Sequence, residues 1–518
     1  MDNLNRCLAV LIMGLTYKVF DASAAKILLL PIDHLNHVNM LAVAGQKLAT
    51  QGHEVTILCA PRTEKILTKF TTIEKWFYNF PSHWKNSDLD ERLQATVFNG
   101  TNWDLYKVSN DLMNGAMGDH VKLLEDKELE KRIDDSKFDL AVCDGAMLNR
   151  ILLILPYRHG IPFLQLSPVP EPWRAGVLSL PSVESFLFLK ASDKMTFFER
   201  VLNTIMTVCF YTFTPPVSKS RFHELITKHV PNKPALTQSE LYLKSEMWLV
   251  NMEHHILDFP HVSHPAYRII GGVGVKPVTP LTGDLAKFVD GAKDGVILMT
   301  FGSGVHHIPE DIMDKLMTGF SQIKQRVVMR SKGAKLSNKP ENVMLMDWIP
   351  QSDVLGHPKT RVFITHGGNS GQLEAVARSV PMLYVPLAGD QRHNAYKAMA
   401  RGYGLMIDIN NFTPNELVDN INELIDNKSY KENLLKAAAI LKDLPNPQDE
   451  MAFWVNHVLK FGGSHLKPIS LDMPWYQWLM LDILVFMIFI AFIFYQIIKI
   501  SCRLMCRCCC KGGKQKND

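Results

Sequence analysis

The pattern of apolar and polar positions predicts alternating strands and helices in the first half of the chain. Two apolar runs, Ala25–Ile32 and Glu54–Cys59, are typical of strands, and Asn39–Gln51 between them carries apolar residues at helical spacing. A strand–helix–strand unit of this length implies that the two strands pair in parallel. The same pattern predicts later strands at Phe138–Cys143 and Ile161–Leu166.

The second half repeats this alternation after a Gly- and Pro-rich run, GGVGVKPVTPLTG. Such a run is typical of a linker, and 518 residues are too many for one ordinary hydrophobic core. We therefore predict an α/β fold with two doubly wound, Rossmann-like domains at 25–270 and 291–465, joined by a linker at 271–290. The strands predicted in the second domain are Gly295–Phe301, Gln325–Met329, Val343–Met346, Arg361–Thr365, Met382–Val385 and Leu405–Ile407.

Both ends of the chain carry apolar segments that predict a membrane protein of the secretory route. Residues 1–24 have the charge, the short apolar stretch and the A-x-A cleavage pattern of a signal peptide. Residues 477–499 form a predicted transmembrane helix, because about 20 apolar residues span a bilayer. Aromatic residues precede this segment and basic residues follow it. We therefore expect a single-pass type I protein with a cytoplasmic tail at 500–518.

The remaining composition fits a lumenal body and argues against nucleic acid as a partner. The net charge is only +4, and the sequence has no basic stripe with interleaved aromatic residues. Sequons at Asn99, Asn411 and Asn427 predict N-glycosylation. The chain ends in KQKND, which fits a retrieval signal of the endoplasmic reticulum and equally a plain basic tail. We expect the protein in the endoplasmic reticulum membrane.

One apolar region has no motif. Ser185–Phe213 carries aromatic and aliphatic residues on helical patterns. A buried helical insertion, a lipophilic acceptor pocket and a surface that rests on membrane lipid all fit this pattern, and they do not exclude one another.

Polar or small residues follow five of the predicted strands. Doubly wound sheets bind their ligands at the carboxyl ends of the strands, so these residues are candidates for a site. In chain order they are Asp33, His34 and His37; Asp144; Gly302, Ser303 and Gly304; His366; and Asp390 with Gln391.

The stretch FITHGGNSGQLEA predicts an anion site between a strand and a helix. Glycines at 367, 368 and 371 let the backbone approach a ligand, and the amides at the start of a helix favour a diphosphate. His366 and Ser303 can add hydrogen bonds, Glu374 can accept from ribose hydroxyls, and Trp348 offers a stacking face for a base. A Walker A motif and a G-x-G-x-x-G after the first strand are both missing, so ATP and NAD are poor candidates.

The segment Trp348–Gln391, WIPQSDVLGHPKTRVFITHGGNSGQLEA…VPMLYVPLAGDQ, resembles the signature of the UDP-glycosyltransferases, most of all the membrane-bound UDP-glucuronosyltransferases. GHEVTIL at 52–58, FDLAVCD at 138–144 and both ends of the chain extend the resemblance over nearly its whole length. It implies a GT-B fold, in which two Rossmann-like domains face each other across a cleft. The first domain would bind the acceptor and the second the UDP-sugar.

The resemblance also implies a donor site. In it Trp348 and Gln351 would bind uridine, His366 and Ser303 the diphosphate, and Glu374 the ribose, while Asp390 and Gln391 would hold hydroxyls of the sugar. The backbone of Gly368, Ser370 and Gly371 completes the expected donor-binding set. The family implies a UDP-sugar as donor substrate, with no cofactor and no metal.

The implied reaction is hexosyl transfer with inversion to a hydroxyl of a small lipophilic acceptor. His37 stands sixteen residues before His53, the spacing of the family's catalytic base, and Asp144 matches its carboxylate partner. An imidazole can take the hydroxyl proton while a carboxylate orients it. The segment between His34 and His37 is one residue longer than the family pattern, so His34 is a rival base.

The identity of the sugar stays open at this stage. Glucuronosyl transfer is the first expectation, but His261 stands where glucuronosyl-specific relatives often carry an arginine, and histidine is a weaker carboxylate partner. A UDP-glucosyltransferase of the same fold and a non-catalytic binding protein on a degenerate transferase fold are the alternatives. A homo-oligomer is compatible with all three.

Overall fold

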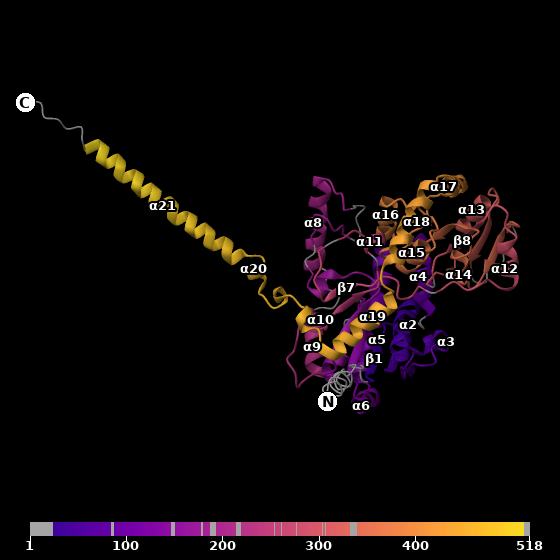
Figure 1. Ribbon diagram of the computed structural model, residues 1–518, viewed down its shortest axis with the longest axis horizontal. Coiled ribbons are helices and arrows are strands. Elements are labelled where there is room, and N and C mark those ends of the chain that lie inside the picture. Colours follow the sequence, from indigo (N-terminus) through magenta and orange to yellow (C-terminus); the bar gives the residue numbers. More distant parts are fainter. Residues whose placement is uncertain are drawn as a thin grey trace, which may run out of the picture. The chain divides into compact units, whose positions relative to one another are not determined.

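The computed structural model describes residues 24–83, 87–146, 151–177, 180–186, 193–213, 219–252, 254–260, 262–275, 277–302, 304–305, 307–331 and 339–511. The chain divides into two compact units at Leu466. The first unit contains two parallel β-sheets with their helices, and the second contains a long apolar helix (Figure 1). The predicted signal peptide lies outside the described residues except for Ala24.

The first sheet has the strand order β3-β2-β1-β4-β5-β6-β7, and every pairing is parallel. Four strands match the predictions from the sequence. The other three have only three or four residues, which is too short for a periodicity to be recognised. The bounds are β1 (Lys26–Leu30), β2 (Glu54–Cys59), β3 (Glu74–Phe77), β4 (Leu140–Asp144), β5 (Phe163–Ser167), β6 (Trp248–Val250) and β7 (Tyr267–Ile269).

Helices cover both faces of this sheet, which explains why its central strands are apolar throughout. In β1, Leu28 and Leu30 belong to one hydrophobic cluster, whereas Ile27 and Leu29 belong to another. The helices of this part are α2 (Leu35–Thr50), α3 (Glu64–Leu67), α4 (Ser87–Asn99), α5 (Asn102–Glu125), α6 (Lys127–Ser136), α7 (Ile154–His159), α8 (Phe197–Phe213), α9 (Lys219–His229), α10 (Gln238–Leu243) and α11 (His254–Leu257).

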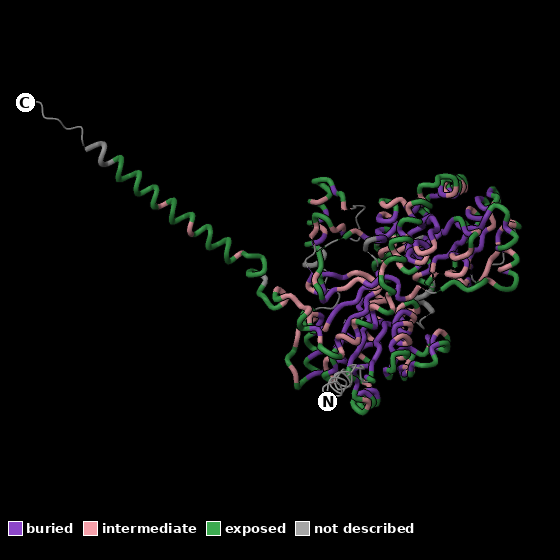
Figure 2. The backbone as a smooth tube through the Cα atoms, in the orientation of Figure 1, coloured by how far each residue is buried: buried purple, intermediate pink, exposed green. Residues whose placement is uncertain are grey.

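The second sheet has the strand order β10-β9-β8-β11-β12-β13, again fully parallel. All six of its strands are predicted from the sequence to within one or two residues at either end. Figure 2 shows that the strands are the most deeply buried part of the first unit. The bounds are β8 (Val296–Thr300), β9 (Arg326–Arg330), β10 (Val343–Met346), β11 (Thr360–Thr365), β12 (Met382–Tyr384) and β13 (Gly404–Met406).

The helices that accompany the second sheet are α12 (Gly283–Asp290), α13 (Glu310–Phe320), α14 (Gln351–Leu355), α15 (Asn369–Ala377), α16 (Gln391–Ala400), α17 (Pro414–Asp426), α18 (Lys428–Asp443) and α19 (Pro447–Phe461). The last of them packs against the first sheet. Met451, Ala452 and Val455 of α19 are buried in the cluster that contains Ile27 and Leu29, on the side covered by α2.

A second element crosses between the two sheets. Phe98 of α4 is buried in the core of the second sheet, with its ring 6.3 Å from that of Phe301. The Gln94 amide donates to the carbonyl of Gly304 at 2.6 Å. The first unit is therefore joined by helices that are exchanged in both directions.

Strand order also locates the places where ligands bind in such sheets. The direction in which successive strands are added to the sheet reverses between β1 and β4 in the first sheet and between β8 and β11 in the second. Crevices form at the carboxyl ends of strands at such switch points. Asp144 is the last residue of β4, and His366 directly follows β11.

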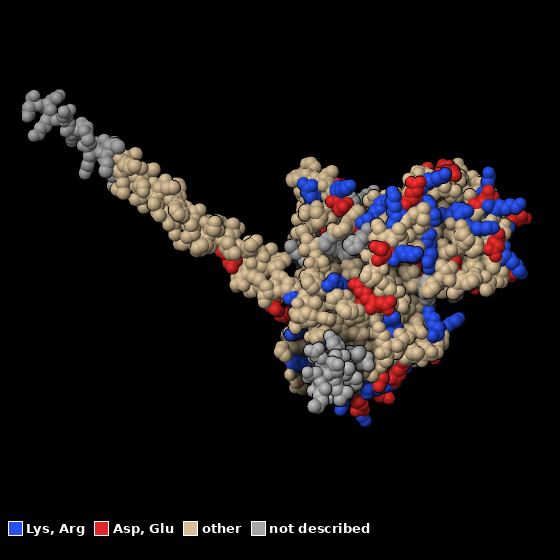
Figure 3. Space-filling model, viewed as in Figure 1, with Lys and Arg blue, Asp and Glu red and all other residues tan. Residues whose placement is uncertain are grey.

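The second unit holds α20 (Trp475–Trp478) and α21 (Leu481–Lys511). Within the described residues one helical segment, Leu481–Cys506, is long and apolar enough to cross a bilayer, with a mean hydropathy of 2.5. Figure 3 shows one almost uncharged face of this helix. The continuous helix begins at Leu481, after Met480 with a φ of 55°, and runs into the predicted tail.

Candidate functional site

His37 of α2 and Asp144 at the end of β4 form a pair beside the first sheet. The Nδ1 atom of His37 lies 2.8 Å from Oδ2 of Asp144, and the side chains are 19% and 0% exposed. A carboxylate can only accept, so Nδ1 donates and Nε2 is left as the basic nitrogen. The pair thus has the geometry of a general base with its orienting carboxylate.

Backbone donors fix the carboxylate of Asp144. The amide of Ala146 donates to Oδ1 at 2.9 Å, and the amide of Ile32 donates to Oδ2 at 3.4 Å. These bonds come from the ends of β4 and β1, so the sheet itself aligns the carboxylate with His37. Such second partners hold a catalytic imidazole in one orientation.

The helix that carries His37 begins earlier than the sequence predicts. We expected it from Asn39, but α2 starts at Leu35 with His34 as its N-cap residue in an extended conformation. His37 therefore lies in the first turn of the helix and not in a loop. The boundary is misjudged because polar residues at Asp33, His34, Asn36 and His37 make this stretch resemble a loop.

His34 lies beside this pair. Its ring meets that of His37 edge-on, with 5.1 Å between the ring centres. Burial, reinforced by His37 and Arg62, lowers the pKa of His34 to about 3. His34 is therefore a neutral imidazole at physiological pH.

In the second sheet, His366 sits between two glycines. A Cβ atom at Gly302 would lie 2.9 Å from Cε1 of His366, and one at Gly368 would lie 2.7 Å from Nε2. Gly302 also has a φ of +76°, which side chains rarely adopt. Both glycines are therefore required for the ring to take its place. Burial lowers the pKa of His366 to about 4.

The start of α15 follows this ring. Gly368 is the N-cap residue, and the helix has nine residues. The first amides of a helix have no partner inside it and attract anions. Ser370 is exposed and Gly371 is buried in this first turn. The expected diphosphate site is thus assembled from β8, β11 and α15.

Asn394 ties this turn to Asp390. Its amide donates to Oδ2 of Asp390 at 2.8 Å and to the carbonyl of Gly367 at 3.0 Å. The amide of Asn369 reaches the same carboxylate oxygen at 3.4 Å. Burial raises the pKa of Asp390, with Lys397 and His37 among the charges that act against it. His37 of the first sheet's α2 is therefore near enough for its charge to act on Asp390.

Two more residues that we expect to bind the UDP-sugar are in direct contact with each other. The amide of Gln351 donates to Oε2 of Glu374 at 2.6 Å, which joins α14 to α15. Trp348, in contrast, is 66% exposed. Its ring faces the guanidinium of Arg330 at 5.4 Å, and Arg330 donates to the carbonyls of Gly302 and Asp347. Arg330 thus joins the Trp348 ring to Gly302, the glycine that lies against His366.

Gln391 plays a part that the sequence did not suggest. Its side-chain oxygen accepts the amides of Leu387 and Ala388, at 2.8 and 3.0 Å. The residue closes the turn between β12 and α16, and its side-chain NH₂ is the group that these two bonds do not use.

Two of the predicted site residues, Ser303 and His261, lie outside the described residues. Their neighbours are described: Gly302 lies against His366, and Asp258 and Phe259 dock on α16. Of the sequons, Asn411 and Asn427 are exposed, and Asn99 is the last residue of α4.

Three contributions to the site were missed by sequence reasoning. Asn394 and Arg330 hold the turns described above. Lys397 of α16 pairs with Asp258 at 2.5 Å, with both side chains 9% exposed. Each of these residues lies within a helix or at a strand end, where nothing in the sequence distinguishes it from ordinary surface. A pairing across 139 positions leaves no local pattern.

Comparison with known proteins identifies the class. The family profile described as "UDP-glucoronosyl and UDP-glucosyl transferase" matches residues 25–516, so the chain belongs to this family. UDP-glucuronosyltransferase 2B17 of Homo sapiens is 29% identical over 98% of both chains. UDP-glucuronosyltransferase 2B14 of Oryctolagus cuniculus is also 29% identical over 98% of both chains.

Solved structures agree on the architecture. The glycotransferase of kitacinnamycin superimposes with a TM-score of 0.61 at 20% identity, covering 84% of this chain and 99% of its own. Together with the two parallel sheets, this likeness shows the GT-B fold that the resemblance implied. The protein is a UDP-glycosyltransferase, most similar to the glucuronosyltransferases.

Proposed function

We propose that the protein transfers a glucuronosyl group from its UDP-sugar to a hydroxyl of a small lipophilic acceptor, with inversion at the anomeric carbon. The observation that carries this proposal is the His37–Asp144 pair, because a chain that only bound nucleotide-sugars would not need a base aligned by a buried carboxylate. A non-catalytic binding protein is correspondingly disfavoured.

In this proposal His37 takes the acceptor proton at Nε2 as the hydroxyl oxygen attacks the anomeric carbon. The bond from that carbon to the diphosphate oxygen breaks, and UDP leaves with the electron pair. Asp144 holds the imidazole and stabilises its charged form. A single displacement of this kind inverts the anomeric centre. The exposure of His37 and its direct bond to Asp144 favour it over His34 as the base.

The leaving group would be stabilised by the second sheet. His366 and the amides at the start of α15 would meet the charge that grows on the diphosphate. Gln351 and Glu374 would bind uridine and ribose, with Trp348 stacking on the base. Asp390 and the amide of Gln391 would address sugar hydroxyls. Ser303 and the backbone of Gly368, Ser370 and Gly371 belong to the same proposed donor site.

A glucosyltransferase remains the second candidate for a specific reason. The hydroxyls that Asp390 and Gln391 would bind are shared by glucose and glucuronic acid, and His261 is a weaker carboxylate partner than arginine. The similarity to two glucuronosyltransferases over nearly the full chain supports glucuronic acid as the first choice.

The proposed setting is the membrane of the endoplasmic reticulum, with the first unit in the lumen. The apolar segment Leu481–Cys506 would be the anchor, and the basic residues that follow favour a cytoplasmic tail. The protein would then have access both to membrane lipid and to a lipophilic acceptor. Glycosidase digestion of intact and permeabilised microsomes tests this orientation through Asn411 and Asn427.

The central experiment incubates membranes that contain the full chain with one phenol and a panel of UDP-sugars. We expect transfer from UDP-glucuronic acid that continues in the presence of EDTA. His37→Ala should lower the rate by about 10²–10⁴-fold, as loss of a general base does, while UDP binding persists.

The matched variant for this test is His34→Ala. Transfer that survives in His37→Ala and is lost in His34→Ala would show that His34 is the base and that the proposal names the wrong histidine. If the wild-type chain binds UDP and transfers no sugar from any donor, the binding-protein alternative replaces the proposal.

A further inference from the structure

A second histidine–aspartate pair lies close to the proposed catalytic pair. The Nδ1 atom of His83 lies 2.7 Å from Oδ2 of Asp119, and the side chains are 10% and 5% exposed. The backbone amide of His83 donates to the same oxygen at 2.8 Å. The arrangement repeats that of His37 and Asp144, but nothing in the proposed reaction uses it.

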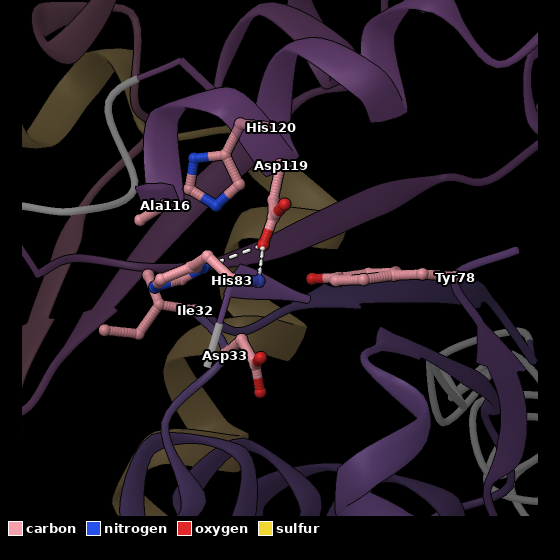
Figure 4. A pocket seen from close by; sticks show the side chains of 7 residues that line it. All are labelled: Ile32, Asp33, Tyr78, His83, Ala116, Asp119 and His120. Atoms are coloured by element: carbon pink, nitrogen blue, oxygen red, sulfur yellow. Dashed lines mark hydrogen bonds and ion pairs between the residues drawn. The ribbon is translucent and has the colours of Figure 1, made fainter. Parts of the chain in front are cut away.

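The pair borders a small cavity, which Figure 4 shows from close by. Ala116, Asp119 and His120 line it from one face of α5, since residues three and four apart share a helix face. Ile32 and Asp33 line it from the segment that follows β1, immediately before the helix that carries His37. The cavity therefore adjoins the place where an acceptor hydroxyl would react.

The size of the cavity suits one oxygen atom. Its free volume is about 10 Å³, which is near the minimum for one water molecule. Gly115 sets the spacing on the α5 side, because a Cβ atom there would lie 2.9 Å from the ring of His83. The cavity is completed by Tyr78, whose hydroxyl points toward His83 and Asp119 in Figure 4.

The two carboxylates at the cavity are already neutralised. Nε of Arg62 donates to both oxygens of Asp33, at 2.8 and 2.9 Å. Lys122 donates to Oδ1 of Asp119 at 3.2 Å, while His83 occupies the other oxygen. In the part of the chain that the structure describes, no three side chains are grouped as a metal ion would require. The lining residues are therefore suited to bind neither a cation nor an anion.

The remaining polar groups at the cavity fit a partner that can both donate and accept hydrogen bonds. Burial lowers the pKa of His120 to about 4, so its ring is neutral at pH 7, with one donor and one acceptor nitrogen. Burial also holds the pKa of Tyr78 well above its usual range, so the phenol keeps its proton. His120 is 3% exposed, and among the described residues its Nδ1 atom has no hydrogen-bond partner.

We propose that this cavity is a polar subsite of the acceptor pocket, which binds a second oxygen of the acceptor while the first is glycosylated. The inference rests on the function proposed above and names its substrate class: lipophilic acceptors with two oxygen groups, of which the second is a hydroxyl. A resident water would satisfy the same groups, and the experiment must separate the two.

The test compares α-naphthol with naphthalenediols that carry the second hydroxyl on the far ring. The quantity measured is the ratio of kcat/KM for each diol over α-naphthol, with the full-length protein in membranes. For the diol that reaches the cavity we expect a ratio of about ten or more, since a buried polar group left without its partner costs about a factor of that size.

Two substitutions remove the subsite, and each has a matched control. Tyr78→Phe deletes one hydroxyl without changing shape, and its control is Tyr157→Phe, where a hydroxyl that donates to the carbonyl of Pro234 at 3.0 Å is lost. His120→Leu removes the free nitrogen. Its control is His159→Leu, from a pair with Asp134 at 2.7 Å, whose carboxylate is 63% exposed.

We expect the ratio to fall to near one in Tyr78→Phe and His120→Leu and to keep its wild-type value in both controls. If His120→Leu does not fold, Tyr78→Phe decides. A wild-type ratio near one for every diol, or a ratio unchanged in Tyr78→Phe, overturns the proposal and leaves a resident water only.

Failure of the proposed function would look different. Transfer to α-naphthol by the wild-type protein reports on that function alone. If no acceptor is glycosylated, the same ratio is taken from equilibrium binding of the diols and α-naphthol by calorimetry. A diol preference that Tyr78→Phe abolishes would then support the subsite without the reaction.

Discussion

At the scale of single residues, His366 is defined by what surrounds it. It lies between Gly302 and Gly368, and within the described part of the chain its Nδ1 atom has no hydrogen-bond partner. Because burial lowers its pKa to about 4, the ring is neutral at physiological pH. It can therefore give a diphosphate one hydrogen bond but no full positive charge.

His366→Ala should weaken UDP binding without abolishing it. The helix amides of α15 remain, and one hydrogen bond to a charged group contributes about 1.5–3 kcal/mol, or roughly 10- to 150-fold in affinity. Calorimetry with UDP measures the effect, with His159→Ala as a control. Equal affinities of wild type and variant would remove His366 from the proposed donor site.

The sugar depends on another single residue. The segment that ends in Pro260 is anchored on α16, because Arg401 donates to the carbonyl of Asp258 and lies 4.9 Å from the ring of Phe259. The position that follows is His261, and α16 begins directly after Asp390. An arginine at 261 would offer a planar fork to a sugar carboxylate.

His261→Arg should raise the ratio of kcat/KM for UDP-glucuronic acid over UDP-glucose by about tenfold, the value of roughly 1.4 kcal/mol. The same ratio in His261→Gln, which has no charge, controls for size. If the ratio is the same in wild type and in both variants, residue 261 does not discriminate between the two sugars.

At the scale of elements, the buried pair of Lys397 and Asp258 holds α11 against α16. Phe259 donates its amide to Oδ1 of Asp258 at 2.8 Å, and the lysine lies 2.5 Å from the same oxygen. Lys397 and these hydrogen bonds outweigh the effect of burial and lower the pKa of Asp258. Breaking a buried pair by removing one partner leaves an uncompensated charge, whereas removing both is less harmful.

Lys397→Met should therefore destabilise the protein by about 3–5 kcal/mol, and Lys397→Met with Asp258→Asn should recover part of the loss. Thermal unfolding of the solubilised protein gives the comparison. Lys287→Met, from an ion pair with 80% and 88% exposed side chains, is the control and should leave the midpoint where it is. A double variant no more stable than the single one would contradict the pairing.

Sequence patterns predict these elements unevenly. Long apolar strands such as Val296–Thr300 could be read directly, because both faces are buried. The three-residue strands β6 and β7 could not, since so few residues carry no periodicity. In the site, His37, Asp144 and His366 could be named from motifs. Asn394 and Arg330 could not, because their partners are backbone carbonyls that only folding brings near.

At the scale of the whole molecule, the sequence order of the two domains conceals how they are joined. Phe98 lies among residues of the first sheet in the chain but is buried in the second core. Val455 follows the last strand of the second sheet but is buried against α2. Both segments have ordinary amphipathic patterns. Such a pattern predicts that one face of the helix is buried, but it does not identify the element against which that face packs. Domain boundaries drawn along the chain miss this exchange.

Three histidines with strongly lowered pKa values link the stability of the first unit to pH. Burial lowers the pKa of His34 to about 3 and those of His120 and His366 to about 4. Between about pH 4 and 6.5 the unfolded chain binds protons at these rings that the native protein does not. Stability therefore rises with pH across this window and falls on acidification.

Carboxylates act mainly outside that window. Hydrogen bonds and a neighbouring cation keep the pKa values of Asp119 and Asp258 below their usual 3.8, so their stabilising effect is lost only at lower pH. Asp390 has the opposite sign, because burial raises its pKa and native protonation then opposes acid unfolding. The net slope between pH 4 and 6.5 should nevertheless follow the three histidines.

The expected outcome is a thermal midpoint that decreases steadily from pH 7 to pH 5. Each of the three histidines should contribute about 1.4 kcal/mol for every pH unit below 6.5. His120→Leu removes one of these groups, so its midpoint should depend less steeply on pH than that of the wild type. Midpoints measured by calorimetry and by circular dichroism over this range give both slopes. Parallel curves for the two proteins would mean that His120 is protonated in the native state as readily as in the unfolded chain.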